Sequence, residues 1–178
     1  WHPNPDSLKI MVNLGRNVLL QFPEDRRENV TMVFSAHSLP ERIRTWDDPY
    51  ERQLLESSAA VAEMAGLTEL VRSPRRWRFA FQSAGNTGEP WLGPDIIDFL
   101  DTLHSEGVKD VLSVPIGFVS DHLEIRFDLD IEATAKAREL GITNYRPSIA
   151  NRSPEVIQGP ATAGNRKLEL PQAWWHLP

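Results

Sequence analysis

The 178-residue sequence contains no cysteine. That absence excludes disulfide bonds, iron–sulfur clusters, thiolate zinc sites and a cysteine nucleophile. No apolar run approaches the roughly 18 residues that a membrane-spanning helix needs. Basic residues are outnumbered, since 19 Lys and Arg against 25 Asp and Glu give a net charge of −6. Nucleic-acid-binding domains usually concentrate basic residues on one face, so we expect no nucleic-acid partner.

The first residues also lack the pattern of a secretory signal peptide. Because the chain begins at Trp1 and not at Met, we expect it to be a piece of a longer protein. The absence of cysteine fits a reducing compartment, and we expect a cytoplasmic location, with a peripheral membrane contact left open. Hydrophobic residues make up 40% of the chain, which is typical of a packed globular protein.

Short apolar runs alternate along the chain with longer amphipathic segments. The runs predict strands at 30–34, 77–82, 111–114 and 142–145, and the longer segments predict helices at 6–21, 49–65, 94–105 and 121–140. This alternation predicts an α/β fold, a Rossmann-like parallel sheet with helices on both faces. We place that domain at residues 1–150. Residues 151–178 carry several prolines and glycines with little periodicity, and we expect an irregular tail.

Two polar segments follow predicted strands that are far apart in the sequence. His37 comes just after the strand at 30–34, and Glu124 follows the strand at 111–114, near the start of the next helix. Ligands of open α/β sheets bind at the carboxyl ends of the strands, so both side chains are expected at one pocket. A histidine there can bind a divalent metal or accept a proton. The alternative is a loop histidine satisfied by backbone hydrogen bonds.

Three carboxylates recur at steps of four along the helix predicted at 121–140. Glu124, Asp128 and Glu132 therefore share one helical face. Such a track offers oxygen ligands to a hydrated divalent cation, or a relay for protons. The alternative is a solvated acidic face with Arg126 as local compensation. Asp121 is expected to cap this helix.

The segment Pro90–Pro94 is a short apolar loop that includes Trp91 and Leu92. Its two prolines restrict the backbone. The loop would serve either as a rigid lip against a flat apolar ligand or as part of the core.

Taken together, these motifs resemble the ferrochelatase family, which inserts ferrous iron into a porphyrin in haem biosynthesis. The resemblance runs in order over about residues 1–150 and is carried by Phe34–Pro40, Asp48–Tyr50, Gln82–Ser83 with Pro90–Pro94, and Val114–Glu124. The loop sequence Gly85-Asn86-Thr87 is similar to that of bacterial members.

The resemblance implies a role for each matching position. His37 and Glu124 would be the opposed catalytic pair, with the division between proton transfer and metal binding left open. The implied metal ligands are His37, Glu124, Asp128 and Glu132, the last three on a helix with a π-type segment. Asp121 and His122 would support the site. The implied porphyrin pocket comprises Ser35, Phe81, Trp91 and Leu92.

The resemblance also implies substrates and partners. The substrates would be Fe²⁺ and a porphyrin, without the iron–sulfur cluster that some relatives carry, because cysteine is absent. Family chains are about twice this long and have two similar domains around the porphyrin cleft, and this chain matches the later half. The chain is therefore the catalytic half of a ferrochelatase, a non-catalytic metal- or tetrapyrrole-binding fragment, or a chelatase for another tetrapyrrole. Its expected protein partner is the missing domain or a second copy of itself.

Overall fold

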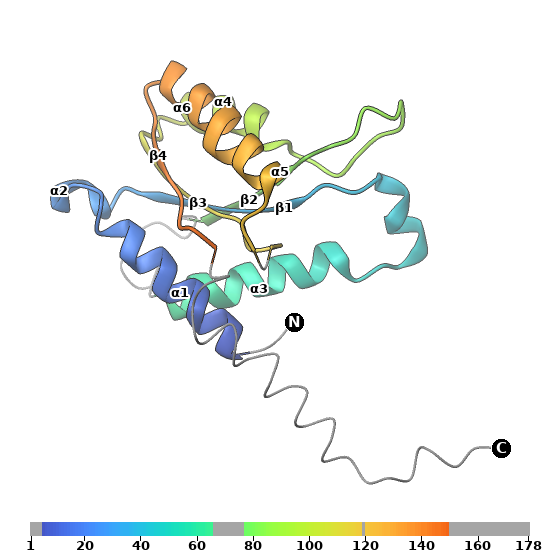
Figure 1. Ribbon diagram of the computed structural model, residues 1–178, viewed down its shortest axis with the longest axis horizontal. Coiled ribbons are helices and arrows are strands. Elements are labelled where there is room, and N and C mark those ends of the chain that lie inside the picture. The colour runs from blue at the N-terminus through green and yellow to red at the C-terminus, as the bar shows by residue number, and fades with distance from the viewer. Residues whose placement is uncertain (1–4, 66–76, 119, 150–178) are drawn as a thin grey trace, which may run out of the picture.

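The computed structural model describes residues 5–65, 77–118 and 120–149 (Figure 1). Within them, four strands form one sheet in the order β2-β1-β3-β4, and every pairing is parallel. The strands are β1 (Thr31–His37), β2 (Trp77–Gln82), β3 (Asp110–Val114) and β4 (Thr143–Tyr145). The predicted parallel α/β sheet is confirmed. The tail predicted at 151–178 lies outside the described residues.

Helices cover both faces of this sheet, as predicted. Helices α1 (Pro5–Leu19) and α3 (Tyr50–Met64) lie on one face, and α4 (Ile96–Ser105) and α6 (Thr134–Glu139) lie on the other (Figure 1). The side chains of β1 alternate between two buried clusters: Phe34 packs on the α1 and α3 side, and Val33 on the α4 and α6 side. Burial on both faces explains why β1 and β3 read as continuous apolar runs.

Strand β1 is longer than the predicted strand at 30–34, so His37 is its last residue and not the first residue of a loop. Ser35 lies in the extension, fully buried, and its hydroxyl donates to Gln82 Oε1 at 3.0 Å. This bond satisfies a polar group that would otherwise oppose burial. The register with β2 therefore continues to the pair His37 and Gln82, which places both residues at the carboxyl edge of the sheet.

The helix predicted at 121–140 consists of three consecutive segments: α5 (Leu123–Ile125), the π-helix η2 (Arg126–Ala133) and α6. The π-type segment implied by the resemblance is confirmed. The Thr134 hydroxyl donates to the Leu129 carbonyl, five residues earlier, at 2.9 Å. Asp121 does not cap the helix, which corrects the prediction. Its carboxylate binds Arg146 and the Ile149 backbone N–H instead, and the helix begins only at Leu123.

Other differences are local. Asp95 caps α4 by accepting a hydrogen bond from the Ile97 backbone N–H at 2.8 Å. Pro94 therefore lies outside the first turn in which it was predicted. Helix α2 (Glu24–Arg27) and the 3₁₀ helix η1 (Glu41–Trp46) were not predicted, because both are too short to show an apolar period. None of the helices within residues 5–65, 77–118 and 120–149 is long and apolar enough to cross a membrane.

Candidate active site

The side chains of His37 and Glu124 meet at the carboxyl edge of the sheet, 87 residues apart in the sequence. His37 Nε2 lies 3.1 Å from Glu124 Oε1. His37 ends β1 and Glu124 is the second residue of α5, so the contact joins the central strand to the helix that follows β3. The side chains are 35% and 45% exposed. The pair is thus preformed and open to a ligand.

The hydrogen bonds of His37 indicate which of its ring nitrogens carries the proton. Its Nδ1 contacts the backbone carbonyl of Ser38, and because a carbonyl only accepts, Nδ1 must carry the proton. A neutral imidazole then presents an unprotonated Nε2 to a carboxylate oxygen that also only accepts. The 3.1 Å contact between Nε2 and Glu124 Oε1 is a hydrogen bond only when one of these two atoms carries a proton. A histidine and a carboxylate in contact are groups that can take up a proton or bind a divalent cation.

The backbone of His37 is anchored by Tyr50, a residue without a predicted role. The Tyr50 hydroxyl donates to the His37 carbonyl at 2.8 Å, and the Tyr50 backbone N–H donates to Asp48 Oδ1 at 2.8 Å. Burial raises the pKa of Tyr50, so the phenol remains a donor at neutral pH. Asp48 and Tyr50 belong to one of the motifs that carried the resemblance, and that was their only sequence signal.

The Asp128 side chain forms hydrogen bonds to residues at the end of β2. Its Oδ2 accepts hydrogen bonds from the Ser83 hydroxyl and, at 3.5 Å, from the Gln82 side-chain amide. Ser83 has a φ of 62°, a left-handed conformation that is costly for a serine and is typical of functional sites. The pKa of Asp95 is raised by burial and by the nearby charges of Asp98 and Asp128, against the lowering effect of backbone hydrogen bonds. A second group of acidic residues therefore lies near the start of α4.

The four predicted metal ligands are not gathered into one cluster. His37 contacts Glu124, Asp128 binds Ser83 and Gln82, and Glu132 is exposed on η2. No group of three or more His, Asp or Glu side chains is arranged to hold a metal ion within residues 5–65, 77–118 and 120–149. Their joint role in metal binding stays a prediction.

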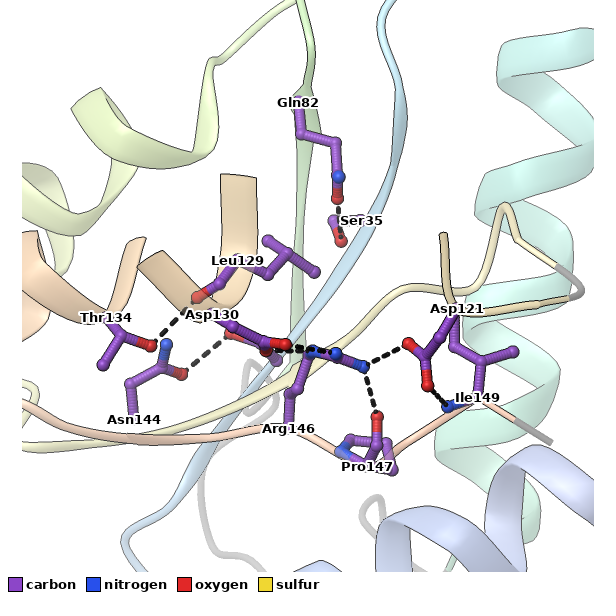
Figure 2. Close-up of polar contacts among 11 residues, drawn as sticks. Ser35, Gln82, Asp121, Leu129, Asp130, Thr134, Asn144, Arg146, Pro147 and Ile149 are labelled. Atoms are coloured by element: carbon purple, nitrogen blue, oxygen red, sulfur yellow. Dashed lines mark hydrogen bonds and ion pairs between the residues drawn. The ribbon is translucent and has the colours of Figure 1, made fainter. Parts of the chain in front are cut away.

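The two predicted supporting residues have different surroundings. Asp121 is nearly buried and accepts from Arg146 Nη1 at 2.8 Å (Figure 2). The His122 ring lies against Phe118, with centroids 5.4 Å apart, at the position just before α5. Arg146 was missed by the sequence analysis, because a single arginine after a short strand carries no distinguishing pattern.

Three of the four predicted pocket residues are buried: Ser35, Phe81 and Leu92. Trp91 is half-buried and donates its indole N–H to Thr87 Oγ1 at 2.9 Å. The loop is fastened beside His37, because the Leu92 backbone N–H donates to the Leu39 carbonyl at 2.8 Å and its carbonyl accepts from the Ser38 hydroxyl at 2.7 Å. The Trp91 ring lies over Gly85, where a Cβ would clash with it.

Comparison with known proteins identifies the family. The sequence model of the ferrochelatase family matches residues 1–167. The chain belongs to the ferrochelatase family. A ferrochelatase of Herpetosiphon aurantiacus is 48% identical over 157 residues, which is 88% of this chain and 49% of the relative. A ferrochelatase of Deinococcus radiodurans is 44% identical over 167 residues, 94% of this chain and 51% of the relative. The coproporphyrin III ferrochelatase of Bacillus subtilis is 40% identical over 169 residues, 94% of this chain and 52% of the relative.

The chain thus spans about half the length of the ferrochelatases that it matches. This agrees with the expectation from the sequence that family chains are about twice as long as this one. Within this half, the family match includes both His37 and Glu124, the two side chains that the fold brings into contact.

Proposed function

We propose that this chain carries the metal-inserting pair of a ferrochelatase, which places Fe²⁺ into a porphyrin in haem biosynthesis. The contact between His37 Nε2 and Glu124 Oε1 supports this function best, because these two groups come from distant segments and converge at the ligand-binding edge of the sheet. The family match and the names of the relatives support the same reaction.

The reaction is a balanced exchange of protons for a metal ion. Fe²⁺ enters the macrocycle as two pyrrole N–H protons leave, so each turnover consumes one Fe²⁺ and releases two protons, with no change in oxidation state. In this proposal His37 and Glu124 accept the protons and replace water on the incoming ion. The division of these two tasks between the residues stays open, since each group can do either.

The neighbouring residues take supporting roles in the same proposal. Asp128 and Glu132 extend the carboxylate track along η2, and Ser83 orients the Asp128 carboxylate. Asp121 and His122 set the start of α5. Trp91 contacts the porphyrin, backed by Ser35, Phe81 and Leu92.

The test is anaerobic metallation of a porphyrin by the purified 178-residue chain, followed by absorbance. Protoporphyrin and coproporphyrin III should both be supplied, with Fe²⁺ or Zn²⁺. We expect insertion above the uncatalysed rate, abolished in Glu124→Gln and His37→Ala without loss of fold. The matched controls are Glu139→Gln and His104→Ala, since both positions are exposed on helices away from the pair. Insertion by Glu124→Gln at the parent rate would contradict the proposal.

A binding fragment without turnover is the second candidate, and the observation in its support is that the chain covers only about half of each relative. It predicts that the chain binds Zn²⁺ or a porphyrin but produces no metalloporphyrin. Adding the polypeptide that carries the rest of the family sequence should then restore insertion.

A further inference from the structure

Glu124 lies in the first turn of its helix, and that turn has no side-chain cap. Helix α5 has only three residues, its N-cap position makes no side-chain hydrogen bond, and it leads directly into the π-helix η2. The three segments α5, η2 and α6 run on as one helix from Leu123 to Glu139, but the first turn of a helix leaves backbone N–H groups without intrahelical partners, and π turns are rare. The orientation of Glu124 must therefore depend on tertiary contacts made on either side of it.

Arg146 makes such contacts on both sides. Its guanidinium Nη1 donates to Asp121 Oδ1 at 2.8 Å, three residues before Glu124. Its Nε and Nη2 donate to the two carboxylate oxygens of Asp130, six residues after Glu124, with the second bond at 2.6 Å. Figure 2 shows the guanidinium between the two carboxylates. One side chain thus ties both flanks of the Glu124 segment to the chain that follows β4.

The Asp121 side of the clamp is shielded from water, whereas the Asp130 side chain is 43% exposed. The Arg146 side chain is 11% exposed and that of Asp121 is 9% exposed. Burial lowers the pKa of Arg146, but the hydrogen bonds and charges of Asp130 and Asp121 more than offset this effect, so the group stays charged. A guanidinium holds a carboxylate through two parallel bonds, which fixes direction as well as distance. The Ile149 backbone N–H donates to Asp121 Oδ2 at 3.0 Å, which secures the clamp to a second point of the chain.

We propose that Arg146 is a positioning residue for Glu124. By holding Asp121 and Asp130 together, it sets α5 at the angle that brings the Glu124 carboxylate to His37 Nε2. The proposal rests on the function proposed above for its catalytic consequence, while the clamp itself can be tested without turnover.

The test combines metallation kinetics with amide hydrogen exchange on the 178-residue chain. In Arg146→Ala we expect kcat for Zn²⁺ insertion to fall roughly 10- to 100-fold, with KM for the porphyrin unchanged, because a small misplacement of a reacting group is costly. Exchange should rise on the order of tenfold in residues 123–133 and little elsewhere. Arg146→Lys keeps the charge without the two-pronged geometry and should recover only part of kcat.

Arg26→Ala is the matched control. Arg26 also binds a carboxylate, that of Asp110 at the start of β3, and it donates to Thr143 of β4 at 3.1 Å, but within the described part of the chain none of its hydrogen bonds goes to α5 or η2. We expect this variant to lower Tm while leaving kcat and the exchange of residues 123–133 unchanged. An equal loss of kcat in both variants, or parent-level exchange and kcat in Arg146→Ala, would overturn the proposal. If the parent chain does not metallate, the kinetics are repeated with the polypeptide that carries the rest of the family sequence, and no insertion there means that the proposed function fails. Hydrogen exchange then decides the clamp by itself: a rise confined to residues 123–133 in Arg146→Ala supports it, and a uniform pattern refutes it.

Discussion

At the scale of single residues, each side chain of the site is held in place by a hydrogen bond to a neighbouring residue. The His37 ring is oriented by the Ser38 carbonyl, and its own carbonyl is held by Tyr50. The Asp128 carboxylate is similarly held by Ser83. Directional hydrogen bonds of this kind reduce the conformational freedom of reacting groups before a substrate arrives.

Tyr50→Phe removes one of these supports. We expect it to lower the free energy of unfolding by about 0.5–1.5 kcal/mol, the usual contribution of an intramolecular hydrogen bond. Because burial raises the pKa of Tyr50 in the folded state, the unfolded chain releases the phenol proton first as pH rises. The stability that Tyr50 provides is therefore complete below about pH 10 and is lost above it. Urea denaturation of parent and variant at pH 8 and pH 11 checks this, and a difference that does not narrow at pH 11 would contradict it.

Replacing Asp128 and Glu132 together by alanine tests the carboxylate track. We expect weaker binding of Zn²⁺ in calorimetry, because two oxygen ligands are lost from η2. Glu63→Ala is the control, since it removes an exposed carboxylate from α3. If the double variant binds Zn²⁺ as the parent does, the track is only a solvated acidic face.

At the scale of elements, close packing fixes the loop between β3 and α5 against β1. A Cβ placed on Gly117 would lie 2.5 Å from the Ala36 Cβ and 3.0 Å from its Cα. The Gly117 backbone N–H also donates to the Ser35 carbonyl at 3.2 Å. The loop leading to Glu124 can therefore approach the strand that ends in His37 only because this position has no side chain.

Gly117→Ala should accordingly destabilise the protein by about 1–3 kcal/mol, as overpacking of a well-packed contact does. Gly15→Ala is the control, and it should raise the free energy of unfolding. Its Cβ would meet only Met32 Cε, at 3.7 Å, and alanine favours the interior of α1 by about 0.5–1 kcal/mol. Urea denaturation measures both. A neutral Gly117→Ala would show that the loop relaxes away from β1.

At the scale of the whole molecule, the α5–η2 segment presents a row of exposed apolar side chains beside the site. Leu123, Phe127 and Ile131 are 84%, 49% and 58% exposed and recur every four residues. Contiguous exposed apolar surface usually marks an interaction site. Because the chain spans about half of its relatives' length, we propose that the rest of the family fold covers this row in the complete protein.

The isolated chain should then bind a hydrophobic dye or self-associate. Changing Leu123, Phe127 and Ile131 together to glutamine should remove most of the dye fluorescence. Changing Leu20 and Leu55 to glutamine should not, because those exposed residues lie at the end of α1 and on α3. A monomeric parent chain without dye binding, judged by size-exclusion chromatography and fluorescence, would argue against a covered face.

The sequence by itself determined the class of fold and the family. Buried parallel strands must be apolar on both sides, so β1 and β3 are legible as uninterrupted runs, and helices must show an apolar face. The motifs at Phe34–Pro40 and Val114–Glu124 carried the family and both members of the proposed catalytic pair. These features depend on residues close together in the chain, so they can be recognised from the sequence alone.

Only the tertiary structure decided how the site is held. The Tyr50 bond to His37, the Ser83 bond to Asp128 and the Arg146 clamp each join segments distant in the sequence. The end of β1 at His37 follows its backbone pairing with Gln82 of β2, and Asp121 binds Arg146, which lies 25 residues later. Hydrogen-bond partners are chosen by proximity after the chain has folded, so no periodicity or local propensity records them.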